Sequence, residues 1–407
     1  MRDSIISILL SMMVLASCER GTPMVNLGVD DVYYIARMQK LRLESALTGK
    51  DYRWTLHRVG IPDSVLSSDR SMIFLARDEG SYSISFDIID DSTPYHHDFV
   101  VNVLHEEVEY SAYIARVYEY CPAPGQFINT MPLYEDGDTY SDMLRKCEES
   151  VSGKNDVLVS LGGYGGYMTF GFDHTVINVA GERDFMILGN TFYELTNPEK
   201  KGGSAEPGIV MVSYDVNGNG LPDDAWYELA GSEYYKPGTL HGYSITYSRP
   251  DEAKTPVPDK MGFLSDTEYI KWTDSEGRDG YVARNIYHAQ PYYPMWVDAD
   301  ELSFTGSLLP DNGVDQSGIG TYFVLYSFDW GYVDNHPNEY EELNSFDISW
   351  AVDAFGNSVC LPGADFIRVY TGVNQYCGWI GETSTEICRA QDLHIKIVGD
   401  IPDDPIK

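Results

Sequence analysis

The residues between 215 and 224 have the types and spacing of a cation-binding loop. They read DVNGNGLPDD, with oxygen-bearing side chains at Asp215, Asn217, Asn219 and Asp223 around two glycines. Oxygen ligands at alternate positions of a tight turn can wrap one hard cation, as the first half of an EF-hand loop does. The twelfth position is Trp226, where an EF-hand has a bidentate glutamate. Two interpretations therefore stay open, a short calcium-binding loop and a turn in which Asn and Gly adopt positive φ.

A second set of oxygen-bearing side chains lies just upstream. Asp184, Asn190 and Glu206 occur in a Gly-x-x-Asp, Asn and Glu-Pro order that ends at the start of an expected strand. This order is similar to that of calcium-stabilised jelly-roll modules of surface proteins, in which such residues are oxygen ligands. The alternative is that the three side chains cap the ends of strands.

Aromatic side chains are frequent and clustered. The chain has 31 Tyr, 15 Phe and 7 Trp, and five aromatic clusters lie in its turn-rich second half. One ring of each adjacent pair is expected in the core, while outward-facing rings can stack on a flat ligand whose rim is bound by amides and carboxylates. The predicted ligand contacts are Trp226, Tyr234, Tyr235, Tyr292, Tyr293, Trp296, Trp330, Tyr332, Asn374, Tyr376 and Trp379.

The known catalytic motifs are missing from the sequence, which predicts a binding protein and not an enzyme. No G-x-S-x-G elbow, H-E-x-x-H pair or phosphate loop occurs, and the histidines are scattered. With 63 Asp and Glu residues, pairs of carboxylates at glycosidase spacing are expected by chance and do not discriminate.

The elements that must position these residues are mainly β-strands. Short alternating runs separated by Gly, Asn, Asp and Pro predict an immunoglobulin-like or PKD-like β-sandwich over residues 31–105 and a larger jelly-roll-like β-sandwich over residues 156–400. Residues 106–155 form the linker, in which residues 138–151 are expected to be an amphipathic helix with Asp138 as its N-cap.

The cysteines show no metal-binding spacing. Apart from Cys18, five remain of the six, so at least one thiol is left unpaired. Cys121 with Cys147 is one plausible disulfide and a pair among the last three is another, with buried free thiols as the alternative.

The N-terminus predicts export and lipid attachment. A short apolar run leads to Leu-Ala-Ser-Cys, so residues 1–17 are expected to be a signal peptide, Cys18 the lipidated residue and residues 18–30 a tether. Cleavage removes one base and one acid, Arg2 and Asp3, and leaves the formal charge of −35. This charge argues against nucleic acid or anionic lipid as a partner, so the membrane contact is expected through the lipid anchor alone.

Several longer segments resemble one family, the PKD-like-domain cell-surface lipoproteins of the Bacteroidetes. The resemblance covers residues 110–395 approximately and rests on the segments YCPAPGQFIN (120–129), LGGYGG (161–166), GFDH (171–174), EPGIVMV (206–212), WYELAGS (226–232), HAQPYYP (288–294) and YTGVNQ (370–375). Members associated with corrinoid uptake are the BtuH-type cobalamin-binding lipoproteins. The resemblance implies a lipid-anchored protein on the outer face of the outer membrane that captures cobalamin and delivers it to a TonB-dependent transporter.

The ligand stays open between two classes. Cobalamin is a broad corrin disc fringed with amides, which predicts one wide aromatic patch with a polar rim. A glycan of a polysaccharide uptake system would use the same residue types, but in a narrower groove. Calcium is the expected cofactor, if any, and it would be structural.

Overall fold

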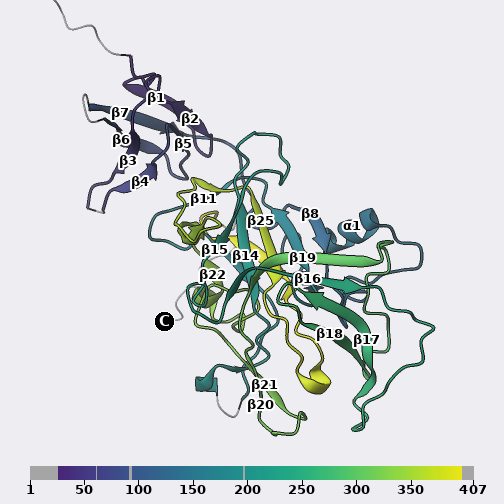
Figure 1. Ribbon diagram of the computed structural model, residues 1–407. Helices are drawn as coiled ribbons and strands as arrows, with labels where there is room; N and C mark the ends of the chain where they lie inside the picture. The colour runs from purple at the N-terminus through teal and green to yellow at the C-terminus, as the bar shows by residue number, and fades with distance from the viewer. Residues whose placement is uncertain (1–25, 61, 91–93, 196–197, 397–407) are drawn as a thin grey trace, which may run out of the picture.

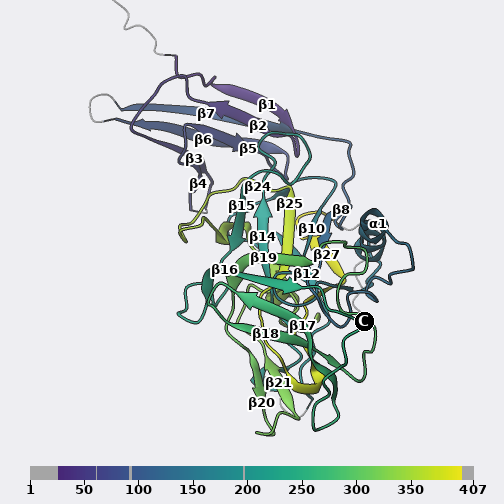
Figure 2. The same ribbon diagram turned by 45° about the vertical axis from the view of Figure 1, so that its right-hand side comes forward.

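The computed structural model describes residues 26–396 except 61, 91–93 and 196–197, and the side chain of Trp379 is also outside this description. The predicted signal peptide, Cys18 and most of the tether therefore lie outside the described residues. Figures 1 and 2 show a smaller N-terminal β domain at one end and a larger β domain below it. None of the helices in the described ranges is long and apolar enough to cross a membrane.

The N-terminal domain is a β-sandwich with a tryptophan at its centre. A five-stranded sheet has the order β1-β7-β6-β3-β4 and faces the pair β2-β5. Trp54 on β3 is fully buried and stacks on Phe86 of β6 with ring centroids 3.8 Å apart. β6 is one of the alternating runs expected in residues 31–105, with Ile84, Phe86 and Ile88 buried on one face. The strands are β1 (Val32–Ala36), β2 (Leu41–Glu44), β3 (Asp51–His57), β4 (Ser64–Ser67), β5 (Ser71–Phe74), β6 (Gly80–Ile89) and β7 (Tyr95–Leu104).

A six-stranded sheet forms the centre of the larger domain. Its order is β23-β15-β14-β25-β10-β8, and every pairing in it is antiparallel. Both of its faces are covered, so its inner strands are apolar along their length instead of alternating. The strands are β8 (Arg116–Cys121), β10 (Tyr167–Gly171), β14 (Gly208–Ser213), β15 (Trp226–Leu229), β23 (Ala351–Val352) and β25 (Phe366–Thr371).

One face of the central sheet packs against a four-stranded sheet of order β18-β17-β16-β19. The layer between the two sheets is rich in tyrosine, including Tyr164, Tyr243 and Tyr370. Figure 2 shows these strands crossing in front of β14 and β25. They are β16 (Leu240–Ser248), β17 (Leu264–Asp274), β18 (Asp279–Asn285) and β19 (Glu301–Leu308).

The other face of the central sheet is covered by α1 and short strands. Met168 of β10, Val210 of β14 and Val369 of β25 point to this side, where they join Met143 and Cys147 of α1 in one core. The remaining elements are α1 (Tyr140–Val151), β9 (Val159–Ser160), β11 (Val176–Ile177), β12 (Phe185–Leu188), β13 (Gly202–Gly203), β20 (Gly313–Asp315), β21 (Phe323–Tyr326), β22 (Ser345–Phe346), β24 (Gly363–Ala364), β26 (Glu386–Ile387), β27 (Arg389–Asp392) and the 3-10 segments Pro198–Lys200, Glu341–Asn344, Ile348–Trp350 and Gly378–Ile380.

The predicted fold class is confirmed, since the chain is mainly β and packs sheets face to face. The predicted cap of α1 is wrong. Thr139 is the N-cap, with Asp142 completing a capping box, while the Asp138 carboxylate accepts from the Glu135 amide and pairs with Lys146 at 2.7 Å.

The suggested Cys121–Cys147 disulfide is also absent, and both thiols are free. Cys121 is opposite Tyr167 in the β8–β10 pairing, so its side chain shares the face of the sheet that Tyr167 occupies. Cys147 on α1 contacts Met168, which points to the opposite face. The central sheet therefore separates the two sulfur atoms.

Candidate functional site

Four of the predicted ligand-contact tyrosines are core residues. Tyr234, Tyr292, Tyr293 and Tyr332 are at most 7 % exposed, and the last three belong to the layer between the two large sheets. The hydroxyl group of Tyr292 donates to the His288 carbonyl, and that of Tyr293 to the Ala299 carbonyl. These rings stabilise the sandwich and are not surface contacts, which corrects the prediction made for them.

Three further predicted contacts are partly buried and already have partners. The Arg368 guanidinium lies 4.2 Å from the Trp226 ring centroid. Trp296 stacks on Tyr120 with centroids 5.8 Å apart. The amide of Asn374 donates to the Tyr243 hydroxyl at 3.3 Å. Each of the three predicted residues holds neighbouring elements together.

The exposed members of the predicted set fall in two places. Tyr235 is 70 % exposed and donates to the Gly356 carbonyl, next to Phe355, which is 90 % exposed. Trp330 is 38 % exposed and packs against Trp350, and the Ser232 amide bonds the Trp330 carbonyl. We call Tyr235, Trp330 and Phe355 the aromatic surface.

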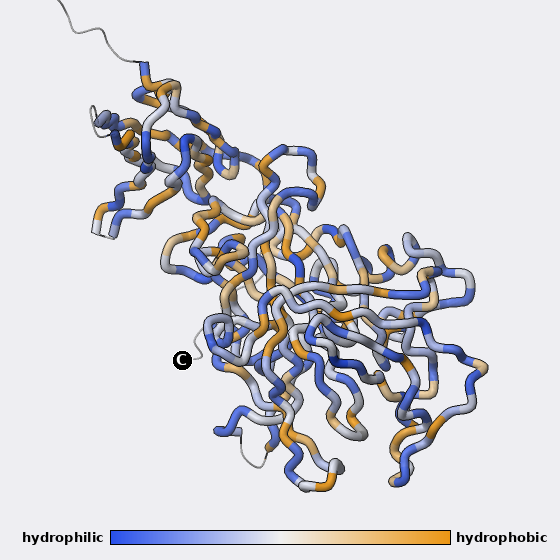
Figure 3. The backbone as a smooth tube through the Cα atoms, in the orientation of Figure 1, coloured by the Kyte–Doolittle hydropathy of each residue, from blue (hydrophilic) through white to orange (hydrophobic). Residues whose placement is uncertain are grey.

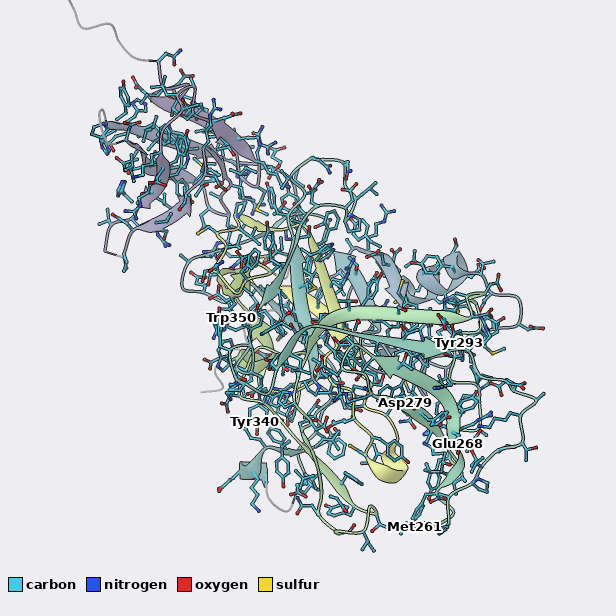
Figure 4. The ribbon with its side chains drawn as sticks, viewed as in Figure 1. Met261, Glu268, Asp279, Tyr293, Tyr340 and Trp350 are labelled. Carbon is cyan, nitrogen blue, oxygen red and sulfur yellow. The ribbon has the colours of Figure 1, made fainter. Side chains whose placement is uncertain are left out.

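The other exposed ring, Tyr376, precedes the 3-10 segment Gly378–Ile380, which borders the pocket described next. Figure 4 shows Trp350 and Tyr293 on opposite sides of the larger domain. Because most of the predicted rings are buried or partly buried, they do not form a single exposed patch.

A pocket of about 410 Å³ lies at the end of the larger domain that faces away from the N-terminal domain. Its lining is mostly apolar and aromatic, with a few polar groups, as is usual for small-molecule sites. We call it the aromatic pocket. The side chains and backbone that line it belong to Gln126, Phe127, Phe192, Glu194, Gly203, Ser204, Glu206, Tyr287, His288, Tyr322, Phe323, Val324, Leu325 and Ile380.

Hydrogen bonds and ring contacts hold the walls of this pocket in place. Phe127 packs edge-to-face on His288 with centroids 4.7 Å apart. The Tyr322 hydroxyl lies 3.3 Å from a Glu194 carboxylate oxygen across the mouth. The Gln126 side chain donates to the Ile380 carbonyl and accepts from Asn285. Figure 3 shows strongly hydrophobic residues on the neighbouring β20–β21 hairpin.

A larger depression of about 550 Å³ is less suited to an apolar ligand. It lies on the surface between residues 248–251 and 300–301, and its lining includes Arg249, Asp251, Asp300 and Glu301 but no aromatic ring. The aromatic pocket is therefore the stronger candidate for a binding site.

Three carboxylates meet at the inner wall of the aromatic pocket. Glu206, which lines the pocket, Asp334 and Glu386 each place one carboxylate oxygen within 4.8 Å of the other two. We call them the carboxylate cluster. The Glu206 amide donates to the Asp334 carbonyl, and the Glu386 amide donates to the Asp334 carboxylate at 3.0 Å. Backbone hydrogen bonds therefore fix the three residues relative to one another.

Burial dominates the electrostatics of the carboxylate cluster. It raises the pKa of Asp334 to about 6 and that of Glu386 to about 8, and the neighbouring carboxylates also raise the pKa of Glu206 above its usual range. Glu382, close by, has a pKa raised by burial to about 8. Among the described residues, no Lys, Arg or His nitrogen forms an ion pair with these four carboxylates within 4.0 Å.

The structure separates the predicted ligands of the second cation motif. Glu206 is in the carboxylate cluster, and Asn190 is next to it, because the Asn190 amide donates to Asp334. Asp184 instead accepts from the amides of Val179 and Ile348 and from the His394 ring. Its buried carboxylate joins backbone segments, as the strand-capping alternative expects.

In the 215–224 loop the oxygen atoms bond the loop itself. Asp215 accepts from the amides of Gly218 and Gly220, and Asp223 accepts from the amides of the Asn217 and Asn219 side chains. Gly218 and Gly220 have φ of 73° and 72°. This geometry fits the turn interpretation, and calcium binding by Asp215, Asn217, Asn219 and Asp223 stays a prediction.

Sequence reasoning missed most of the pocket. Asp334 is in the segment DNHP, whose residue types are typical of a turn, and Glu386 follows a run of Ser and Thr. Neither position has the spacing of a ligand motif, so neither residue was predicted. Tyr287 has no aromatic neighbour in the sequence, and the adjacent pairs Phe192-Tyr193 and Tyr322-Phe323 were not among the predicted clusters. Glu206, predicted as an oxygen ligand, is the one predicted site residue that lines the pocket.

Comparisons with known proteins give little for this chain. No protein-family model matches it, and no curated protein matches. Among solved structures, it is similar over 88 % of its length to one chain described as "Structural basis for the promiscuous specificity of the carbohydrate-binding modules from the beta-sandwich super family", with 91 % of that chain covered, 8 % identity and a TM-score of 0.13.

Proposed function

We propose that this chain is a lipid-anchored binding protein of the outer cell surface whose aromatic pocket takes one or two sugar rings of a glycan without breaking a bond. The observation that carries the proposal is the pocket of about 410 Å³ with aromatic walls and a carboxylate at its inner side. Aromatic faces stack on the C–H face of a sugar, and the polar groups bind its hydroxyls.

The pocket's lining supplies both kinds of contact. Phe127, Phe192 and Tyr322 are aromatic, whereas Gln126 and Glu206 bring oxygen atoms to the same space. A narrow aromatic pocket is what the glycan alternative predicts, because a corrin disc is broader than this space and would have to lie on a surface.

Cobalamin capture is the second candidate, and the aromatic surface favours it. Tyr235, Trp330 and Phe355 are exposed rings on three chain segments that hydrogen bonds and ring packing connect. An open surface of this kind suits a wide, flat ligand that is covered on one face. In this candidate, delivery to a TonB-dependent outer-membrane transporter follows capture.

Two matched substitutions separate the candidates. Phe192→Ala removes a pocket ring that is 60 % exposed, and Phe355→Ala removes a ring of the aromatic surface that is 90 % exposed, so neither opens the core. We expect Phe192→Ala to weaken glycan binding about tenfold, the effect of losing about 1.4 kcal/mol, and Phe355→Ala to leave it unchanged.

The soluble chain from Glu19 onward would be screened on a glycan array, and hits titrated by calorimetry, beside a titration with cyanocobalamin. Glycan binding that Phe192→Ala weakens supports the pocket. Saturable cyanocobalamin binding that only Phe355→Ala weakens would replace it with corrinoid capture. Binding of neither ligand class would overturn both candidates.

A further inference from the structure

The carboxylate cluster lacks the positive charge that its geometry calls for. Three like charges within 4.8 Å repel one another strongly where water is scarce, and Asp334 and Glu386 are 0 % and 2 % exposed. The ion pairs of the described residues do not include Glu206, Asp334 or Glu386. Protons or a cation from solution can neutralise such a cluster.

A fourth carboxylate nearby has an oxygen with no partner. Glu382 is 6 % exposed, and its Oε1 accepts from the Gln126 amide at 2.6 Å, while its Oε2 is buried without a hydrogen bond. Glu382 is two residues before Ser384, whose amide donates to Glu206 and whose hydroxyl donates to Glu386. A buried carboxylate oxygen without a donor is costly unless a cation or water satisfies it.

The remaining hydrogen bonds orient the cluster as a set of ligands would require. Asp334 Oδ1 accepts from the amides of Asn190 and Thr191, and Ser384 Oγ donates to Glu386 Oε1 at 2.9 Å. Such outer contacts fix the direction of coordinating carboxylates. Three donors occupy Asp334 Oδ1, whereas Asp334 Oδ2 accepts only from the Glu386 amide and keeps a lone pair for an ion. Glu206 opens the cluster to the pocket.

We infer that Glu206, Asp334 and Glu386 bind one hard divalent cation, calcium in class, at the inner wall of the aromatic pocket. The ligands are all oxygen, with no His or Cys among them, which suits calcium and not zinc. Calcium accepts six to eight oxygens in irregular geometry, so water from the pocket side completes the shell. The cation site is independent of which ligand the pocket takes.

The test is calorimetric titration of the chelator-treated chain from Glu19 onward with calcium chloride, with tyrosine-sensitised terbium luminescence as a second readout. We expect one saturable site and a higher Tm with calcium present. Glu386→Gln and Glu206→Gln should each weaken binding at least about tenfold, the loss of one charged ligand. Because Glu206 is partly exposed to the pocket, its variant serves if Glu386→Gln fails to fold.

Asp223→Asn is the matched control, because Asp223 is in the other loop with cation-ligand spacing. Its calcium affinity should equal that of the parent chain. Absence of calcium binding by the parent chain would overturn the inference, as would a site that Asp223→Asn abolishes and Glu206→Gln leaves intact. Glycan binding is not needed for this readout, so failure of the glycan proposal and failure of the cation site are distinguishable.

Discussion

Glu228 shows how one carboxyl group couples the central sheet to pH. It is on β15 with one carboxylate oxygen 2.7 Å from the Ser307 hydroxyl of β19, and burial raises its pKa to about 7 from an ordinary value of 4.5. Between these two values the folded chain keeps a proton that the unfolded chain has lost. This group therefore lowers the free energy of unfolding as pH rises from about 4.5 to 7, by on the order of 3 kcal/mol.

Glu228→Gln tests this coupling. The amide stays neutral in both states, so the variant should gain stability relative to the parent chain as pH rises through this window, with little difference below pH 4. Urea unfolding followed by tryptophan fluorescence at pH 4, 6 and 8 measures it. Glu276→Gln, at an exposed turn, is the control. Parallel pH profiles for Glu228→Gln and the parent chain would contradict the assignment.

The residue types predicted that oxygen ligands and aromatic rings would form the site. They did not predict which of these side chains lie next to one another in the folded chain. Glu206 was identified as an oxygen ligand, and it is in the carboxylate cluster. Asp334 and Glu386 reach it only through the folded connections of distant segments. Tyr292 and Tyr332 were predicted as ligand contacts, but both are buried. The sequence of a turn-rich segment does not distinguish a Tyr whose ring packs in the core from one whose ring is exposed.

At the scale of elements, α1 begins at a cap that can be tested alone. The Thr139 side chain accepts from the Asp142 amide, and the Asp142 carboxylate accepts from the Thr139 amide. Thr139→Ala should lower the free energy of unfolding by about 1 kcal/mol, because one amide of the first turn loses its acceptor. Thr139→Ser should retain most of the stability, since it keeps the hydroxyl. Equal loss in both variants, measured by urea unfolding, would show that the methyl group and not the cap matters.

Periodicity predicted the elements with one buried face better than those with two. β6 alternates within the predicted N-terminal sandwich, and α1 lies within the predicted amphipathic helix. The order of strands in the central sheet did not follow from the sequence, because β14 pairs with β25 from far along the chain. Short strands such as β9 and β26 are defined by that pairing and have no pattern of their own.

The whole molecule is held together at the domain boundary by basic side chains of the N-terminal domain. Lys40 pairs with Asp365 at 2.9 Å and lies over the Tyr214 ring. Arg77 reaches Glu182 and the His394 ring. Each exposed pair contributes at most about 1 kcal/mol, so the docked arrangement depends on several together.

Reversing two of these charges should undock the domains. In the Lys40→Glu, Arg77→Glu double variant, like charges face each other across the boundary, and we expect a larger radius of gyration by small-angle X-ray scattering. The Arg53→Glu, Lys271→Glu double variant, at exposed positions of β3 and β17, controls for the same change in net charge. An unchanged scattering profile in the Lys40→Glu, Arg77→Glu variant would mean that these contacts do not hold the domains.

The walls of the aromatic pocket come from segments spread between residues 126 and 380. Short fragments of the larger domain lack part of this lining, so the pocket is complete only when the distant segments have folded together. A ligand that fits the pocket therefore binds the fully folded domain and not partly folded chains. Its binding raises the free energy of unfolding of the folded domain. In the exported chain that the N-terminus predicts, ligand binding would therefore mark a completely folded domain.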